Sequence, residues 1–267
     1  MKEEIVGGGG SKRVTIEQLR RLYTQAKYQE VIEAVEKEKL DPNNPKDAEK
    51  LLIKAWAYHQ LGEYDKSVPI MEELRQRYEP TSEIGQSARE GVAQGLLQWK
   101  GDLIQADKVM QEIPPSPRRD NARMNYFLQG ARKGLKVPAG EIVNTITEYL
   151  RSVPYTTITG HIINNGTFAL YEARKQKEVQ PYLPVLPSLI MAAIDIYEAT
   201  GAAKNHIAGA LFRASQIFEA AGKKEKAIEK ARDSVALWQE LVNSQDGARF
   251  QRNLKGAQAQ LNRLTRE

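Results

Sequence analysis

A short turn pattern that recurs along the chain constrains its fold more than any other feature. In residues 48–78, Gly62 ends an amphipathic helical pattern, Tyr64 follows two residues later, and Ser67 comes three residues after that. A glycine just past the last turn is typical of a helix C-terminus, because it adopts a positive φ without strain. We therefore expect two amphipathic helices joined by a tight turn, and such a pair buries its apolar faces only by stacking on further pairs.

The same turn pattern returns three more times, with looser matches: Ala26, Tyr28 and Val31; Gly101, Leu103 and Ala106; Gly222, Lys224 and Ala227. The long interval between Gly101 and Gly222 has room for two further helix pairs of about 40 residues each. Helical spacing of apolar residues predicts helices there over residues 121–132, 139–152, 157–175 and 185–200. A last, polar helix is expected over residues 246–264, where it would cap the array.

The repeated unit resembles the tetratricopeptide repeat (TPR). Gly62, Tyr64, Ser67 and Pro80 match the glycine, aromatic, small residue and closing proline of that family. The resemblance covers residues 14–267, is specific at 48–78 and 208–237, and is weak over 121–200. It implies an all-α fold, a right-handed superhelical solenoid of antiparallel helix pairs, with about six pairs and a C-terminal capping helix.

A linker-like segment near the N-terminus separates the chain into two parts. Residues 7–11 read GGGGS, the standard flexible linker of engineered fusions, so residues 1–11 are set apart from a TPR-like domain over 12–267. The preceding MKEEIV is either a cloning scar or a ligand peptide tethered to raise its effective concentration, and we favour the second interpretation. Because five linker residues reach at most about 17 Å, the peptide would meet only the first helices of its own chain or a neighbouring molecule.

Several classes of function are disfavoured by composition. The chain has no cysteine, so thiolate metal sites and cysteine nucleophiles are excluded. None of the three histidines (His59, His161 and His206) stands at metal-ligand spacing, and neither a P-loop nor a Rossmann or nucleophile-elbow motif occurs. We expect a non-enzymatic protein without cofactor or metal, located in the cytoplasm, with a periplasmic location left open. No run of residues is apolar enough for a membrane span.

The resemblance also implies where a partner binds. In TPR arrays the first helix of each pair lines a concave groove, and the matching positions here are Leu52, Trp56, His59, Gln60, Gln98, Trp99, Asn121, Asn125, Gln129, His161, Asn165, Phe212 and Gln216. Asparagine amides can hold a peptide backbone through their donors and acceptor, and aromatic side chains supply apolar anchors. Gly91 and Gly95, four residues apart, are explained most simply by tight helix packing.

These observations lead to one expectation with two alternatives. We expect an adaptor or scaffold that binds a short linear peptide of a partner protein, with MKEEIV as a candidate ligand. The groove positions Leu52 and Trp56 replace the Lys and Asn that TPR co-chaperones use to clasp a C-terminal carboxylate, so that subclass is not supported. The alternatives are self-association, through stacked ends or the fused peptide, and an RNA-associated repeat. The net charge of +5 is spread along the chain, which makes nucleic acid the weaker alternative.

Overall fold

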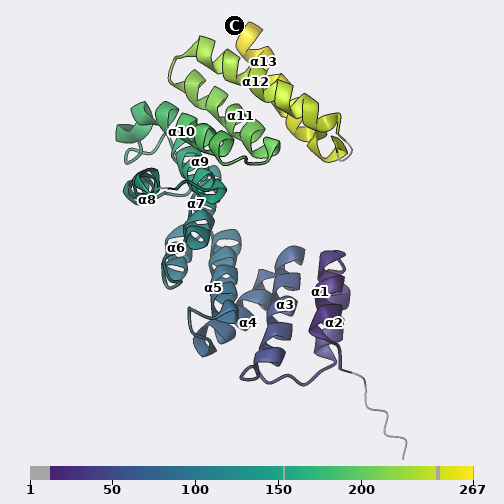
Figure 1. Cartoon of the computed structure of the whole chain (residues 1–267). Helices are drawn as coiled ribbons and strands as arrows, with labels where there is room; N and C mark the ends of the chain where they lie inside the picture. Colours follow the sequence, from purple (N-terminus) through teal and green to yellow (C-terminus); the bar gives the residue numbers. More distant parts are fainter. Residues whose placement is uncertain (1–12, 153, 245–246, 267) are drawn as a thin grey trace, which may run out of the picture. The chain divides into compact units, whose positions relative to one another are not determined.

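The computed structural model describes residues 13–152, 154–244 and 247–266, and within these ranges the chain is all-α (Figure 1). They hold thirteen α-helices, the number that six pairs and one closing helix require. Helices that follow one another in the sequence mostly pack side by side. The expected all-α class is therefore confirmed. The chain divides into two compact units, unit 1 (Met1–Pro114) and unit 2 (Pro115–Glu267). Residues 1–11, predicted to be the segment MKEEIV and a flexible linker, lie outside the described residues.

Unit 1 contains six α-helices in its described part. They are α1 (Ile16–Thr24), α2 (Tyr28–Glu36), α3 (Pro45–Leu61), α4 (Tyr64–Arg77), α5 (Glu83–Gly95) and α6 (Leu103–Gln111). Helix α3 packs against α1, α2, α4 and α5, so it is the central element of the unit. Its start is fixed by Asn44, whose side chain accepts a hydrogen bond from the backbone N–H of Lys46, and by Pro45 in the first turn.

Unit 2 contains the other seven α-helices. They are α7 (Pro117–Arg132), α8 (Ala139–Arg151), α9 (Thr157–Glu172), α10 (Leu186–Ala199), α11 (Lys204–Ala220), α12 (Lys224–Val242) and α13 (Gln251–Arg266). Helix α9 packs against α7, α8 and α10. Helix α11 packs against α10 and α12, and α12 also packs against α13. Helix α9 is buried over most of its length, and Phe168, Ala169 and Leu170 are in the core.

The turns that the sequence pattern predicts are present. Gly62, Gly101 and Gly222 each adopt a positive φ at the end of a helix, between 66° and 77°. Ala26 has a φ of 58° at the equivalent place, a conformation that strains a residue with a Cβ. Gly134, between α7 and α8, and Gly201, between α10 and α11, also have positive φ, 76° and 64°. Neither turn was predicted, although Gly134, Lys136 and Ala139 repeat the residues of the predicted turn at Gly222, Lys224 and Ala227.

Close helix approach explains the paired glycines of α5. A Cβ added at Gly91 would lie 2.8 Å from the Met71 side chain, and one at Gly95 would overlap Val68. Both glycines therefore face α4, which confirms the packing interpretation. It also means that Gly91 and Gly95 do not line an open groove.

Several predicted helix limits were wrong at one end. The helix expected to begin at residue 246 is a short 3₁₀ segment, Gly247–Phe250, before α13 begins at Gln251. Helix α10 begins at Leu186, within one residue of the predicted start, after a 3₁₀ segment, Gln180–Val185, that contains two prolines. Proline removes a backbone donor and limits the preceding residue, which explains why regular α-helix does not begin earlier. Helix α5 ends in a π-helical turn, Leu96–Lys100, that periodicity does not reveal.

One segment meets the length and composition criteria for a membrane span. Among the described residues only Gln180–Ala199 does so, and its helix α10 packs against α9 and α11 within unit 2. Ile190, Ile194 and Tyr197 of this helix are buried. No clear membrane span is therefore present in the described part of the chain.

Candidate functional site

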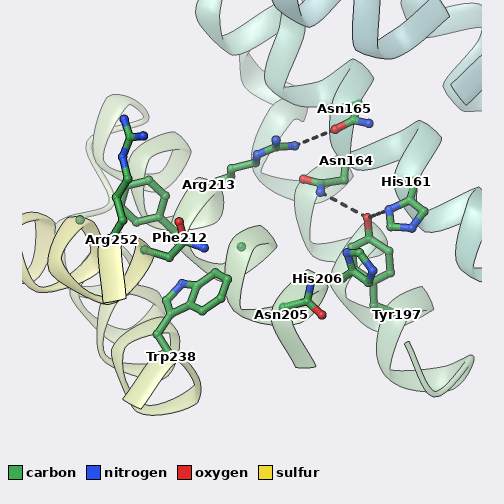
Figure 2. Close-up of a pocket in the computed structure, with 13 residues that line it drawn as sticks. His161, Asn164, Asn165, Tyr197, Asn205, His206, Phe212, Arg213, Trp238 and Arg252 are labelled. Atoms are coloured by element: carbon green, nitrogen blue, oxygen red, sulfur yellow. Dashed lines mark hydrogen bonds between the residues drawn. The ribbon is translucent and has the colours of Figure 1, made fainter. Parts of the chain in front are cut away.

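A cavity of about 500 Å³ opens in unit 2, where helices α9 to α13 meet (Figure 2). Its volume falls in the range of ligand-binding pockets in proteins. Its lining is mostly polar and aromatic: His161, Asn164 and Asn165 from α9; Tyr197 from α10; Asn205, His206, Gly209, Phe212 and Arg213 from α11; Trp238 from α12; and Arg252, Asn253 and Gly256 from α13.

Helical spacing explains why these residues share one surface. On α9, His161, Asn164 and Asn165 stand three and four residues apart, which places them on the same face. On α11, Gly209 and Arg213 are four residues apart, so they also share a face. A capping box at Thr156 and Thr159 starts α9 just before His161, so the first lining residue lies in the second turn of a well-fixed helix.

The charge of the lining is one-sided. Arg213 and Arg252 contribute positive charge, and the described residues of the lining include neither aspartate nor glutamate. Arg252 is exposed at the cavity edge, whereas Arg213 is half-buried. A cavity lined by charge of one sign concentrates ligands of the opposite sign.

Arg213 is the most unusual group in the cavity. It donates a hydrogen bond of 2.9 Å to Asn165 Oδ1, and its guanidinium lies 4.8 Å from the centre of the Phe168 ring. In the described ranges, no carboxylate forms an ion pair with it, and the nearby Glu172 is engaged by Arg132 at 3.3 Å. Burial, and next the charge of Arg132, lower the pKa of Arg213 to about 10. Its charge is therefore present at neutral pH but poorly compensated.

A hydrogen-bonded aromatic cluster of His161, Tyr197 and His206 lies across the cavity from Phe212 and Trp238 (Figure 2). The hydroxyl of Tyr197 lies 2.8 Å from His161 Nδ1 and accepts a longer bond, 3.3 Å, from Asn164 Nδ2. The rings of His161 and His206 are 4.5 Å apart and nearly perpendicular. Burial lowers the pKa of His161, and the charges of His206 and Arg213 lower it further. His161 is therefore neutral at neutral pH.

Asn164 leaves one acceptor without a partner. Its side chain is 7% exposed, and its Oδ1 is buried with no hydrogen-bond partner. A buried acceptor that is unpaired, as Asn164 Oδ1 is among the described residues, costs about 1–3 kcal/mol unless a donor reaches it. Together, the cavity offers positive charge to an anionic group, aromatic faces to an apolar group, and one acceptor to an N–H donor.

The polar groups continue beyond the cavity as a ladder of side chains. Asn165 Nδ2 donates to Asn121 Oδ1 at 3.5 Å, while Asn165 Oδ1 accepts from Arg213. This Asn121–Asn165–Arg213 ladder links α7, α9 and α11, the first helices of three successive pairs in the predicted scheme. Side chains that the sequence analysis assigned to a groove are thus in contact across helices.

The structure brings together part of the predicted set in unit 2. His161, Asn165 and Phe212 line the cavity, and Asn121 joins them through the ladder. Asn125 is exposed and Gln129 is half-buried, but neither lines the cavity. Gln216 lies one turn further along α11 than Phe212, and its Oε1 is buried without a partner.

The predicted residues of unit 1 are arranged differently. The Trp56 indole N–H donates to Ser87 Oγ at 2.9 Å, which joins α3 to α5, and Gln60 Nε2 donates to the Tyr23 hydroxyl at 3.1 Å. Trp99 is 51% exposed on the π-helical turn. Leu52 and Gln98 are half-buried.

His59 is the one member of this set that lies in the interior. It is 4% exposed, its Nδ1 is hydrogen-bonded to Ser67 Oγ, and its Nε2 lies 2.9 Å from the Gly91 carbonyl oxygen. Both ring nitrogens therefore have protein partners, and we leave His59 out of the proposed binding surface.

Sequence reasoning missed most of the cavity. Arg213 directly follows the predicted residue Phe212, and His206 stands seven residues before Arg213. Helical spacing on α11 could therefore have predicted both residues. Tyr197, Trp238 and Arg252 come from helices that were expected to face away from a groove, and no local signal marks them.

The described residues contain no group of three or more His, Asp or Glu side chains that could hold a metal ion. No protein-family model and none of the curated proteins compared with the chain matches it.

Proposed function

We propose that this protein is a non-enzymatic TPR-like adaptor, a solenoid of helix pairs that binds an extended segment of a partner protein along α7, α9 and α11. The observation that carries the proposal is the Asn121–Asn165–Arg213 ladder, which leads into the 500 Å³ cavity of unit 2. The helix count and the recurrent positive-φ turns at Ala26, Gly62, Gly101, Gly134 and Gly222 support the repeat architecture.

The chemistry of the ladder suits a peptide backbone. An asparagine amide offers two donors and an acceptor, so a row of them can bind an extended chain without reading each side chain. Next to this row, Phe212 and Trp238 present aromatic faces in the cavity. Such anchors commonly supply most of the binding energy when a peptide is bound.

The fused segment MKEEIV is the candidate ligand. It contains two acids, Glu3 and Glu4, followed by the β-branched Ile5 and Val6, which favour an extended conformation. The cavity combines two arginines with aromatic faces, which is complementary to that order of residues. If the segment binds as a free peptide or from a neighbouring molecule, the short reach of the five-residue linker does not limit binding.

Peptide binding is tested by calorimetric titration of acetyl-KEEIV-amide into the full chain. The receptor carries Glu3→Gln and Glu4→Gln, so its own N-terminal segment has no acids that compete. We expect saturable one-to-one binding that Asn121→Ala weakens about fivefold or more, because one neutral hydrogen bond contributes about 1 kcal/mol. The matched control is Asn262→Ala, at an exposed position on α13.

The proposal also has a test that does not depend on this peptide. A display selection of random twelve-residue peptides against the same receptor should enrich sequences whose binding Asn121→Ala weakens. No saturable binding by KEEIV, together with no enrichment from the library, would contradict the adaptor function.

A second candidate function, self-association, is favoured by two exposed apolar side chains of unit 1. Trp99 is 51% exposed and Ile104 is 63% exposed, although both are large. Sedimentation equilibrium over a wide concentration range tests it. A mass that rises with concentration, and that Trp99→Lys returns to the monomer, would favour self-association over peptide capture.

A further inference from the structure

We propose that the cavity of unit 2 binds an acidic side chain of the partner segment, and that Arg213 is the cation that pairs with its carboxylate. This inference rests on the proposed peptide binding and names the chemistry of the ligand. It concerns an internal aspartate or glutamate, not a chain terminus.

The first argument is the missing counter-ion of Arg213. In unit 1, the buried Arg89 is paired with Glu112 at 3.1 Å, and the buried Lys50 is paired with Glu38 at 2.5 Å. Arg213 has only the neutral Asn165 amide and the Phe168 ring as partners among the described residues. A half-buried charge without a counter-ion is costly, so the fold leaves a place at Arg213 for an anion supplied from outside.

The second argument is the charge around that place. Arg252 lies on the same cavity, and Arg132 is close enough to lower the pKa of Arg213. The lining holds no acid that would repel a carboxylate. A carboxylate that accepts hydrogen bonds from a guanidinium forms one of the strongest polar contacts available in proteins.

The third argument selects a peptide carboxylate over a free anion. Asn164 Oδ1 is a buried acceptor without a partner among the described residues, and a peptide backbone brings an N–H donor that a free carboxylate ion such as acetate does not. Phe212 and Trp238 add apolar surface, which suits the aliphatic stem of glutamate and a neighbouring Ile or Val. The ligand is therefore an acidic segment with apolar neighbours.

The histidine pair makes this binding depend on pH. Tyr197 from α10 and His206 from α11 are in direct contact with His161. The charge of Arg213 from α11 acts on it, and Arg252 from α13 lines the far side of the same cavity (Figure 2). Burial raises the pKa of Tyr197 to about 12, so its hydroxyl stays neutral. The positive charge of Arg213 disfavours protonation of His161. A bound carboxylate offsets that charge, so it promotes protonation of His161. Linkage then requires that a lower pH strengthens binding of the acidic ligand.

The experiment compares two capped peptides, acetyl-KEEIV-amide and acetyl-KQQIV-amide, by calorimetry at about pH 7.5 and about pH 6, on either side of the ordinary histidine pKa. The receptor is the full chain with Glu3→Gln and Glu4→Gln. Each titration is repeated with Arg213→Gln, with Arg213→Lys, and with Arg232→Gln as a matched control on an exposed face of α12. Inorganic phosphate is added as a competitor in a separate arm.

We expect the acidic peptide to bind about tenfold or more tightly than the amide peptide, as one charged hydrogen bond allows. Arg213→Gln should remove this preference, Arg213→Lys should keep part of it, and Arg232→Gln should leave it unchanged. The preference should grow at the lower pH, and phosphate should compete only weakly.

Different failures have different meanings. Equal binding of both peptides, or a preference that survives Arg213→Gln, would overturn the carboxylate site and leave peptide binding intact. Phosphate that displaces the acidic peptide fully at equal concentration would show a general anion site, and would also overturn the inference. Binding of neither peptide would overturn the inference together with KEEIV as the ligand.

Discussion

Unit 1 and unit 2 each enclose an arginine in different surroundings. Arg89 of unit 1 is 7% exposed, is paired with Glu112 at 3.1 Å, and donates to the carbonyl oxygens of Tyr78 and Gly85 at 3.1 and 2.9 Å. Arg213 of unit 2 donates to one neutral amide and stacks on Phe168. The first arginine has its partners inside the fold, whereas the second faces a cavity with its charge uncompensated.

The histidines show the same difference. His59 in unit 1 has protein partners on both ring nitrogens, Ser67 and the Gly91 carbonyl. His161 in unit 2 has Tyr197 on one nitrogen and lines the cavity beside His206. Burial lowers the pKa of both side chains. A perturbed pKa alone therefore does not mark a binding site; an incomplete set of partners beside an open cavity does.

The largest effect should separate the two arginines. Arg89→Ala removes the ion pair with Glu112 and the side-chain hydrogen bonds to the carbonyl oxygens of Tyr78 and Gly85, so we expect the free energy of unfolding of unit 1 to fall by about 3 kcal/mol. Arg213→Ala removes an uncompensated charge, so unit 2 should change by less than about 1 kcal/mol. Denaturant unfolding followed by Trp56 and Trp99 fluorescence for unit 1, and by Trp238 for unit 2, gives both values. A loss of about 3 kcal/mol at Arg213 would make it a structural residue.

A second effect concerns the glycines of close helix contacts. A Cβ at Gly160 would lie 2.6 Å from the Tyr197 ring, so Gly160→Ala should cost about 1–3 kcal/mol and weaken peptide binding by displacing Tyr197. Gly95→Ala should cost a similar amount through Val68 in unit 1 and leave binding unchanged. Gly140→Ala on α8, outside the cavity lining, is the matched control, because its added Cβ would meet only the Tyr182 hydroxyl, at an ordinary 3.9 Å. Equal effects of Gly160→Ala and Gly95→Ala on binding would contradict the placement of the site.

Acidification should destabilise both units. Because the folded-state pKa of His59 and of His161 is lowered from 6.5, the unfolded chain binds more protons near that pH, and stability falls as pH drops through it. His59→Gln and His161→Gln should each reduce this pH dependence in their own unit, measured as denaturation midpoints at about pH 7.5 and about pH 5.5. Saturating acidic peptide should offset the loss in unit 2 alone. Protection of both units would place the peptide elsewhere.

The smallest effect concerns the turn residues. Among the described residues, Ala26 is the only one other than glycine with a positive φ, so Ala26→Gly should stabilise unit 1 by about 0.5–1 kcal/mol. The reverse change in unit 2, Gly222→Ala at a φ of 71°, should destabilise by about 1 kcal/mol. Thermal unfolding of each variant shows whether the substitution stabilises or destabilises the protein. Destabilisation by Ala26→Gly would mean that packing of the Ala26 methyl group outweighs backbone strain.

The sequence was informative where local rules govern structure. Glycines at Gly62, Gly101 and Gly222 and helical spacing of apolar residues predict most of the helices and their turns, because both depend on neighbours within a few residues. The residues just before α13, Gly247–Phe250, were predicted as regular helix but adopt a 3₁₀ conformation, which the spacing of apolar residues does not distinguish.

The site was less predictable because it depends on contacts between distant residues. His161, Asn165 and Phe212 were found, since they stand at regular steps on predicted first helices. Whether a histidine is enclosed, like His59, or open to a cavity, like His161, depends on residues 32 or more positions away. The missing counter-ion of Arg213 is likewise a property of the folded chain.

The most direct test of the central claim is a map of the peptide on the protein. The full chain with Glu3→Gln and Glu4→Gln is labelled with ¹⁵N and titrated with acetyl-KEEIV-amide, and backbone amide shifts are followed by NMR. The account predicts that the largest shifts cluster around His161, Asn165 and Arg213 on α9 and α11, and that Arg213→Gln needs about tenfold more peptide to reach the same shifts. Shifts centred on Trp56 and Trp99 of unit 1, or no shifts at all, would contradict it.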